Sequence, residues 1–185
     1  MAEVKITETI YVPDRHGWRS WLEEHHRSKK EIWVISYRNG VDLPSIPYLH
    51  AVEEALCFGW IDGIAKTMDV ERRVQRFTPR RRGGHWTELN KERARRLIAQ
   101  GKMTEAGYAT LPDLNVENFV IPPDILAALQ ADPVVWANFQ NFPPLYQRIR
   151  VSFIDEVRKQ PAEFQKRLSN FLNKTRENKT YGVME

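Results

Sequence analysis

The sequence predicts an α+β fold. A small mixed N-terminal region, in which helices pack on a β-hairpin or short antiparallel sheet, is followed by an all-helical C-terminal bundle. Two observations support this prediction. Up to residue 111, apolar side chains at helical spacing alternate with short β-branched and aromatic runs that end in turn residues. Beyond residue 123, the prolines stand where helices begin and the apolar residues keep a helical period.

The first helix and strand are expected in residues 14–40. Trp18 and Leu22 lie at helical spacing behind Asp14, a residue type that suits the N-cap. The segment EIWVISYRNG follows, and its β-branched and aromatic residues predict a strand that ends in a turn at Asn39 and Gly40.

The second helix is expected in the segment SIPYLHAVEEALCFG. Ser45 is the predicted N-cap, Pro47 stands in the first turn, and Gly59 ends the helix. Cys57 shares the apolar face of this helix with Leu56, so it is expected to be a core residue rather than a reactive one.

A basic hairpin, loop and helix come next. WIDGIAKTM and RRVQRFTPR predict two strands joined near residues 69–71, and the second strand is expected to carry Arg76 and its neighbours into solvent. PRRRGGHW is a glycine-containing basic loop that leads to Thr87, the predicted N-cap of a helix ended by Gly101. A short helix from Thr104 to Leu111 follows.

Residues 112–123 form the predicted linker, because prolines bound them and turn-forming residues fill them. The expected organisation is therefore a mixed domain over residues 1–111 and a helical region over residues 124–185. Three or four helices are expected in the second part, with Asp132 before Pro133 as an N-cap signal.

The charge is unevenly distributed. Residues 72–102 contain eleven basic and two acidic residues, a net charge of +9, whereas the rest of the chain sums to −5. Such asymmetry is typical of proteins that bind phosphates, nucleic acid or an acidic partner. The absence of a long apolar run, of signal-peptide features and of a second cysteine predicts a cytoplasmic protein without membrane insertion.

Several segments together resemble the YdeI/OmpD-associated family, also labelled bacteriocin-protection proteins: AVEEALCFGWIDG, RRVQRFTPRRR, HWTELNKERARRLIAQGKMTEAG and the helical tail. The resemblance extends from about Trp18 to the last helix. It implies a role in envelope or antimicrobial-peptide stress and implies no catalytic chemistry. Gly84 stands where the family usually has a serine before the tryptophan of the basic loop, so no role of that hydroxyl is carried over.

The favoured function is binding of an anionic small molecule or an acidic partner through an arginine-rich face. Three consecutive arginines precede a helix N-terminus, where backbone N–H groups already favour anions, and two aromatic rings could stack on a ligand. The candidate ligand-binding residues are Trp60, Asp62, Arg76, Arg80, Arg81, Arg82, His85 and Trp86.

Ordinary structural roles remain open for each candidate. The arginines could form a solvated surface, Asp62 could accept hydrogen bonds in a turn or pair with an arginine, and Trp60 could be a core residue. Two other functions also stay open: a nucleic-acid-binding protein, although no recognition motif is present, and an enzyme with a pocket around Asp62 and His85.

No catalytic residue, metal site or cofactor is expected. The adjacent His25 and His26 point roughly 100° apart on a helix and cannot chelate one ion together. There is no nucleophile elbow of the G-x-S-x-G type.

Overall fold

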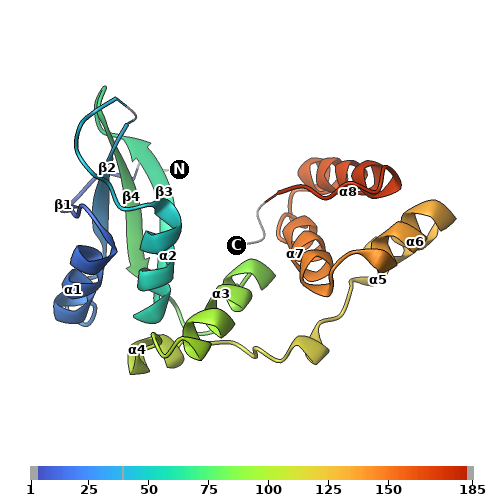
Figure 1. The fold of residues 1–185 in the computed structure, drawn as a ribbon, viewed down its shortest axis with the longest axis horizontal. Coiled ribbons are helices and arrows are strands. Elements are labelled where there is room, and N and C mark those ends of the chain that lie inside the picture. The colour runs from blue at the N-terminus through green and yellow to red at the C-terminus, as the bar shows by residue number, and fades with distance from the viewer. Residues whose placement is uncertain (1–3, 39, 183–185) are drawn as a thin grey trace. The chain divides into compact units, whose positions relative to one another are not determined.

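The computed structural model describes residues 4–38 and 40–182, which divide into two compact units. The N-terminal unit comprises the chain up to residue 84 together with residues 94–112, and the C-terminal unit comprises residues 85–93 and the chain from residue 113 onward. Asn39 of the predicted turn lies outside the described residues. Figure 1 shows the order of the elements along the chain.

The N-terminal unit is built on a four-stranded mixed sheet, which confirms the predicted α+β class. The spatial order is β1-β2-β4-β3, with β1 parallel to β2 and the other neighbours antiparallel. A bulge between Asp62 and Ala65 interrupts the pairing of β3 with β4. The strands are β1 (Thr9–Tyr11), β2 (Ile32–Tyr37), β3 (Trp60–Thr67) and β4 (Arg72–Pro79).

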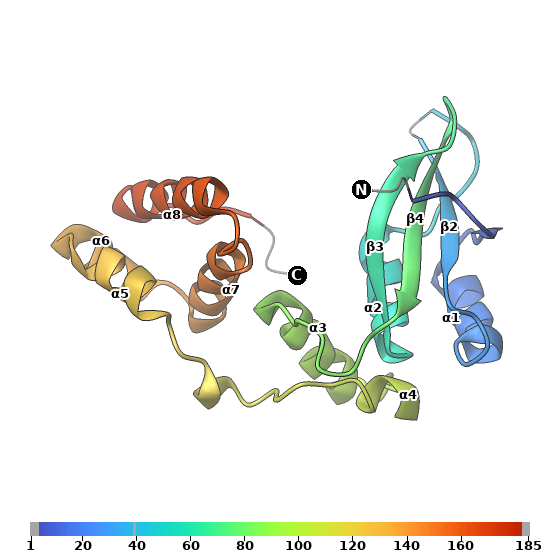
Figure 2. The same ribbon diagram turned by 180° about the vertical axis from the view of Figure 1, so that it is seen from behind.

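Helices α1 (Arg15–His25) and α2 (Tyr48–Cys57) cover one face of this sheet. The ring of Trp18 on α1 lies 5.2 Å from that of Phe77 on β4, and its indole N–H donates to the carbonyl of Ala51 on α2. Figure 2, seen from behind, shows the β3–β4 hairpin passing in front of α2. The buried aromatic rings therefore join both helices to the same side of the sheet.

A buried carboxylate also ties the two helices together. Glu54 on α2 is 2% exposed and accepts hydrogen bonds from Arg15 and Arg19 on α1, the second at 2.7 Å. A buried charge is tolerated only when it is paired in this way.

The start of α2 differs from the prediction. The Oγ of Ser45 accepts a hydrogen bond from the backbone N–H of Tyr37 at 2.8 Å, so it is not the N-cap. Pro47 occupies the N-cap position instead, without a side-chain cap. The predicted cap Asp14 is confirmed, because its side chain accepts from Gly17 N.

The end of α2 is closed by a tight junction with α4 (Glu105–Tyr108). Gly59 has a φ of +71°, and a Cβ on it would lie 2.6 Å from the carbonyl oxygen of Ala106. The carbonyl of Cys57 accepts from both the backbone N–H and the hydroxyl of Thr104, at 3.1 and 2.7 Å. The stretch ALCFGWIDG is thus a packing junction as far as the tryptophan, and Gly59 is required there because L-residues rarely adopt that φ.

Helix α3 (Glu88–Ala99) begins in the C-terminal unit and ends in the N-terminal unit. The hydroxyl of Thr87 accepts from the backbone N–H of Asn90 at 3.1 Å, as predicted for the N-cap, and Gly101 follows the helix with a φ of +66°.

The remaining elements of the C-terminal unit are helical, as predicted. Tyr146 and Phe171 are fully buried in its core, and Asp132 caps α6 through hydrogen bonds from two backbone N–H groups. No helix among the described residues combines the length and apolarity that a membrane span requires. The elements are the 3-10 turn η1 (Val116–Asn118) and the helices α5 (Pro123–Gln130), α6 (Pro133–Asn141), α7 (Pro144–Asp155) and α8 (Pro161–Arg176).

Candidate functional site

Much of the basic segment is neutralised by acidic residues from elsewhere in the chain. Arg72 pairs with Asp69 across the hairpin turn, and the guanidinium of Arg96 lies 3.6 Å from Glu53. The positive charge exposed on the surface is therefore smaller than the net charge of +9 counted for residues 72–102.

Arg76 takes part in the same neutralisation. Its Nε donates to Glu31 at 2.9 Å, and it lies beside Trp33 on the sheet face opposite α1 and α2. The sequence predicted that β4 carries Arg76 and its neighbours into solvent; the Arg76 side chain is 32% exposed and paired with Glu31, whereas Arg73, on the other face, is exposed. Hydrogen bonds from Thr7 and then Arg76 lower the pKa of Glu31.

Trp60 and Asp62 have separate environments. Trp60 is 1% exposed, and its indole N–H donates to the carbonyl of His26 at 3.2 Å, which makes it a core residue. Asp62 accepts a hydrogen bond from the hydroxyl of Tyr48 at 2.6 Å. In the strand register Asp62 faces Phe77, so it lies on the helix-covered face and Arg76 lies on the other.

The three arginines of the basic loop are not equivalent. Arg80 is 8% exposed, and burial lowers its pKa to about 10 although the negative charge of Asp62 opposes the shift. Arg81 and Arg82 are exposed, and neither has an ion-pair partner within the part of the chain that the structure describes. Gly83 follows with a φ of +68°.

His85 and Trp86 belong to the C-terminal unit. His85 is exposed, with its Nε2 3.9 Å from the carboxylate of Glu156, and Trp86 is buried. Burial raises the pKa of Glu156, and the neighbouring charges of His85 and Arg167 act against that rise. An enzymatic pocket would have to unite four of the candidates, and their surroundings differ. Trp60 is a core residue and Asp62 contacts Tyr48. Arg76 forms an ion pair on the opposite sheet face, and His85 belongs to the other unit.

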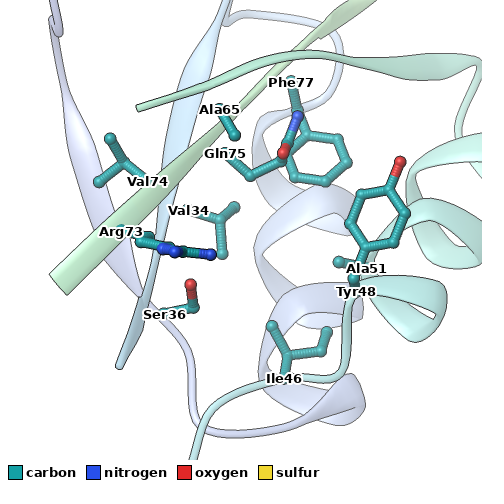
Figure 3. Close-up of a pocket in the computed structure, with 10 residues that line it drawn as sticks. All are labelled: Val34, Ser36, Ile46, Tyr48, Ala51, Ala65, Arg73, Val74, Gln75 and Phe77. Atoms are coloured by element: carbon teal, nitrogen blue, oxygen red, sulfur yellow. The ribbon is translucent and has the colours of Figure 1, made fainter. Parts of the chain in front are cut away.

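A cavity of about 210 Å³ lies between the sheet and α2, on the helix-covered face. We call it the α2 cavity. Figure 3 shows the guanidinium of Arg73 directed into it from β4, with the ring of Tyr48 on the opposite side. Val34 and Ala51 are buried in its wall. Its lining residues are Val34, Ser36, Ile46, Tyr48, Ala51, Ala65, Arg73, Val74, Gln75 and Phe77.

A second, more polar hollow adjoins the α2 cavity and shares Ser36 and Arg73 with it; Tyr37 and Arg38 complete its lining. We call it the arginine hollow. Arg73 stands next to Ser36 on β2 and to Thr67 on β3 in the register, and the guanidinium of Arg38 donates to the Thr67 hydroxyl at 3.3 Å. Both guanidinium groups therefore lie at the same end of the sheet and on the same face.

Neither Arg38 nor Arg73 has an ion pair with Asp or Glu among residues 4–38 and 40–182. Two like charges close to one another without a carboxylate repel each other, and a bound anion would relieve this repulsion. Planar guanidinium groups match carboxylate and phosphate oxygens in pairs.

Sequence reasoning missed this pair of arginines. Strand alternation was the available signal, because residues 73, 75 and 77 of RRVQRF share a face and Phe77 marks that face as the buried one. Arg38 comes close to Arg73 only through the pairing of β2 with β4, which the sequence does not specify.

No group of three or more potential metal ligands is present in the described residues. Cys57 is fully buried, and burial raises the pKa of its thiol to about 11.

Comparison with protein families divides the chain in two. Residues 10–110, more than half of the chain, match the family described as Domain of unknown function (DUF8412). The chain belongs to this family. Residues 118–178 match the family described as Bacteriocin-protection, YdeI or OmpD-Associated (OmdA), so a YdeI/OmpD-associated domain is present in the C-terminal part. No curated protein and no solved structure matches the chain.

The family resemblance noted in the sequence is thus confirmed for the helical tail. The segments AVEEALCFGWIDG and RRVQRFTPRRR, which also suggested it, lie within the DUF8412 match. Every residue of the α2 cavity and the arginine hollow lies in that match as well.

Proposed function

We propose that the N-terminal unit binds a small anionic ligand at the arginine hollow. The observation that carries the proposal is the pair of exposed guanidinium groups of Arg38 and Arg73, which line one hollow without a carboxylate partner in the described part of the chain. The net charge gives further support, because the excess of basic over acidic residues lies in this unit. A positive field of this kind raises the local concentration of anions.

The proposal moves the anion site away from the basic loop. Arg80 is buried close to Asp62, so it is a structural cation rather than a ligand-binding one. Arg81 and Arg82 follow β4, whereas Arg73 lies near its beginning, so the two regions are at opposite ends of one strand.

The test is a calorimetric titration of the protein with inorganic pyrophosphate at fixed ionic strength. Arg73→Gln and Arg38→Gln are each expected to weaken binding by roughly tenfold to a hundredfold, because each removes charge-assisted hydrogen bonds worth about 1.5 to 3 kcal/mol. Arg73→Lys is expected to recover part of the affinity, since it keeps the charge and loses the paired geometry.

Arg81→Gln is the matched control. It removes one exposed arginine without an ion-pair partner in the described residues, at the far end of the same strand, and is expected to leave pyrophosphate binding unchanged. Equal affinity of the parent protein and Arg73→Gln would refute the proposal.

Nucleic acid is the second candidate ligand, and the exposure of Arg81 and Arg82 favours it. Substituting both by Gln while retaining the buried Arg80 is expected to weaken binding to single-stranded DNA and to flatten its salt dependence by roughly 0.7 per lost contact. If this double variant binds DNA as the parent does, the loop is ordinary surface.

We extend the proposal to a cytoplasmic role in stress or antimicrobial resistance. The description of the family that matches residues 118–178, Bacteriocin-protection, supports this extension. Deletion of the gene is expected to sensitise cells to a bacteriocin, and the Arg73→Gln allele is expected to fail to restore resistance. Full restoration by that allele would separate the resistance role from anion binding.

A further inference from the structure

We infer that the ligand is an aromatic or short branched aliphatic carboxylate, whose apolar body fills the α2 cavity while its carboxylate binds Arg73. This inference rests on the proposed function and adds the chemical class of the ligand. The observation behind it is that Arg73 and Ser36 line both hollows, so an anion held there has an apolar cavity directly beside it.

The cavity wall favours an apolar body. Five hydrocarbon side chains face the cavity, those of Val34, Ile46, Ala51, Ala65 and Phe77, and all of them except Ala65 are buried. Burial of apolar ligand surface in such a site is favourable, and a few polar groups then fix the orientation.

The cavity volume limits the size of that body. An apolar cavity of about 150 Å³ accommodates one benzene ring. The α2 cavity, at about 210 Å³, has room for one ring and a few further atoms, or for a branched chain of similar size. A fused two-ring system would extend out of it into solvent.

The polar groups of the lining favour a single carboxylate. The amide nitrogen of Gln75 donates to the carbonyl of Gly63 at 2.7 Å, and the hydroxyl of Tyr48 donates to Asp62. Arg73 and the hydroxyl of Ser36 remain as donors beside the cavity. One guanidinium fork and one hydroxyl satisfy the two oxygens of a carboxylate.

Asp62 acts as a positioning residue for the cavity. Tyr48 is 56% exposed, and its hydrogen bond to Asp62 holds the ring in place as the wall facing Arg73 (Figure 3). Loss of that bond would remove one of the contacts that hold this exposed ring in its rotamer. Asp62 therefore shapes the cavity through Tyr48.

The experiment compares benzoate with acetate, which carries the same head group on a single methyl. Binding is followed by NMR chemical-shift titration of the whole chain. Benzoate is expected to bind about fiftyfold more tightly, from burial of roughly 100 Å² of ring surface. 2-Naphthoate is expected to bind no more tightly than benzoate, because its second ring would extend out of the cavity.

Ala65→Leu tests the location of the ring. Ala65 is exposed on β3 and lines the cavity, so a leucine there fills the space without disturbing the core. It is expected to weaken benzoate binding at least tenfold and to leave pyrophosphate binding intact. Ala65→Ser, which hardly changes the volume, is the matched control and is expected to bind benzoate like the parent. Asp62→Ala, which removes the acceptor of the Tyr48 hydroxyl, is expected to weaken benzoate binding severalfold, with acetate unaffected.

Two failures can be told apart. If benzoate binds no more tightly than acetate, or if Ala65→Leu leaves it unchanged, the inference about the ligand class is wrong, and pyrophosphate binding that depends on Arg73 would still uphold the proposed function. If pyrophosphate and benzoate both bind equally well to Arg73→Gln and to the parent, both the inference and the proposed function are wrong.

Discussion

Replacing Glu54 by Gln is expected to loosen the contact between α1 and α2. The substitution keeps the shape of a side chain that is only 2% exposed and removes its charge. Arg15 and Arg19 would then lose the carboxylate to which both donate. Each charge-assisted hydrogen bond contributes about 1.5 to 3 kcal/mol, and removing one partner of a buried ion pair costs about 3 to 5 kcal/mol.

Two features reduce this figure for Glu54. The arginine side chains are 27% and 29% exposed, so water can solvate them after the change, and glutamine retains one carbonyl acceptor. We therefore expect the free energy of unfolding to fall by about 2 to 3 kcal/mol. Urea denaturation followed by tryptophan fluorescence measures it, because Trp18 lies against α2 through its bond to Ala51.

Glu24→Gln provides the control, since this carboxylate is 74% exposed and its neighbour is a histidine at 3.6 Å. Its effect is expected to stay within about 0.5 kcal/mol. A loss of less than 0.5 kcal/mol in Glu54→Gln itself would show that the buried carboxylate does not hold the two helices together.

Three other predictions concern the N-terminal unit. Gly107→Ala is expected to destabilise the protein by more than about 2 kcal/mol in urea denaturation, because a Cβ there would lie 2.3 Å from the carbonyl oxygen of Cys57; an unchanged midpoint would contradict the tight junction. The thiol of Cys57, buried and with a pKa raised to about 11, is expected to react slowly with a thiol reagent at pH 8 and rapidly in denaturant; fast labelling of the native protein would reopen a nucleophilic role. Since hydrogen bonds from Thr7 and Arg76 lower the pKa of Glu31, its stabilising contribution is present above pH 4.5 and is lost as the pH falls towards the lowered value. Glu31→Gln should therefore be less stable than the parent by about 1 kcal/mol at pH 7, and a difference that does not narrow below pH 4.5 would count against this ion pair.

Local signals in the sequence predicted most elements of the fold. Asp14 and Thr87 were correctly identified as N-caps, and the left-handed glycines at 59 and 101 mark helix ends as expected. These features depend on the chain within a few residues, which is why the sequence reveals them. Ser45 shows the limit, because a distant backbone N–H occupies the hydroxyl that would otherwise cap α2.

The candidate site was harder to predict because its charges depend on distant partners. Arg76 and Glu31 are 45 positions apart, yet they form an ion pair that removes Arg76 from the accessible positive surface. Arg73 lies three residues from Arg76, on the opposite face, and has no such partner in the described residues. A count of arginines treats the two alike. Strand β1 was missed for a related reason, since three residues that pair with a distant strand carry little local pattern.

The division of residues between the two units bears on how the protein responds to proteolysis. Residues 85–93 belong to the C-terminal unit, although the chain returns to the N-terminal unit after them. Glu88 in this segment accepts from Lys91 and lies 3.6 Å from Arg148 on α7, and its backbone N–H donates to the hydroxyl of Ser152. A single cut in the predicted linker, residues 112–123, would leave Glu88 covalently attached to the N-terminal fragment. The released helical fragment would then lack the buried carboxylate of Glu88, which lies beside Arg148. Cleavage there would therefore yield an incomplete helical fragment rather than two independent domains.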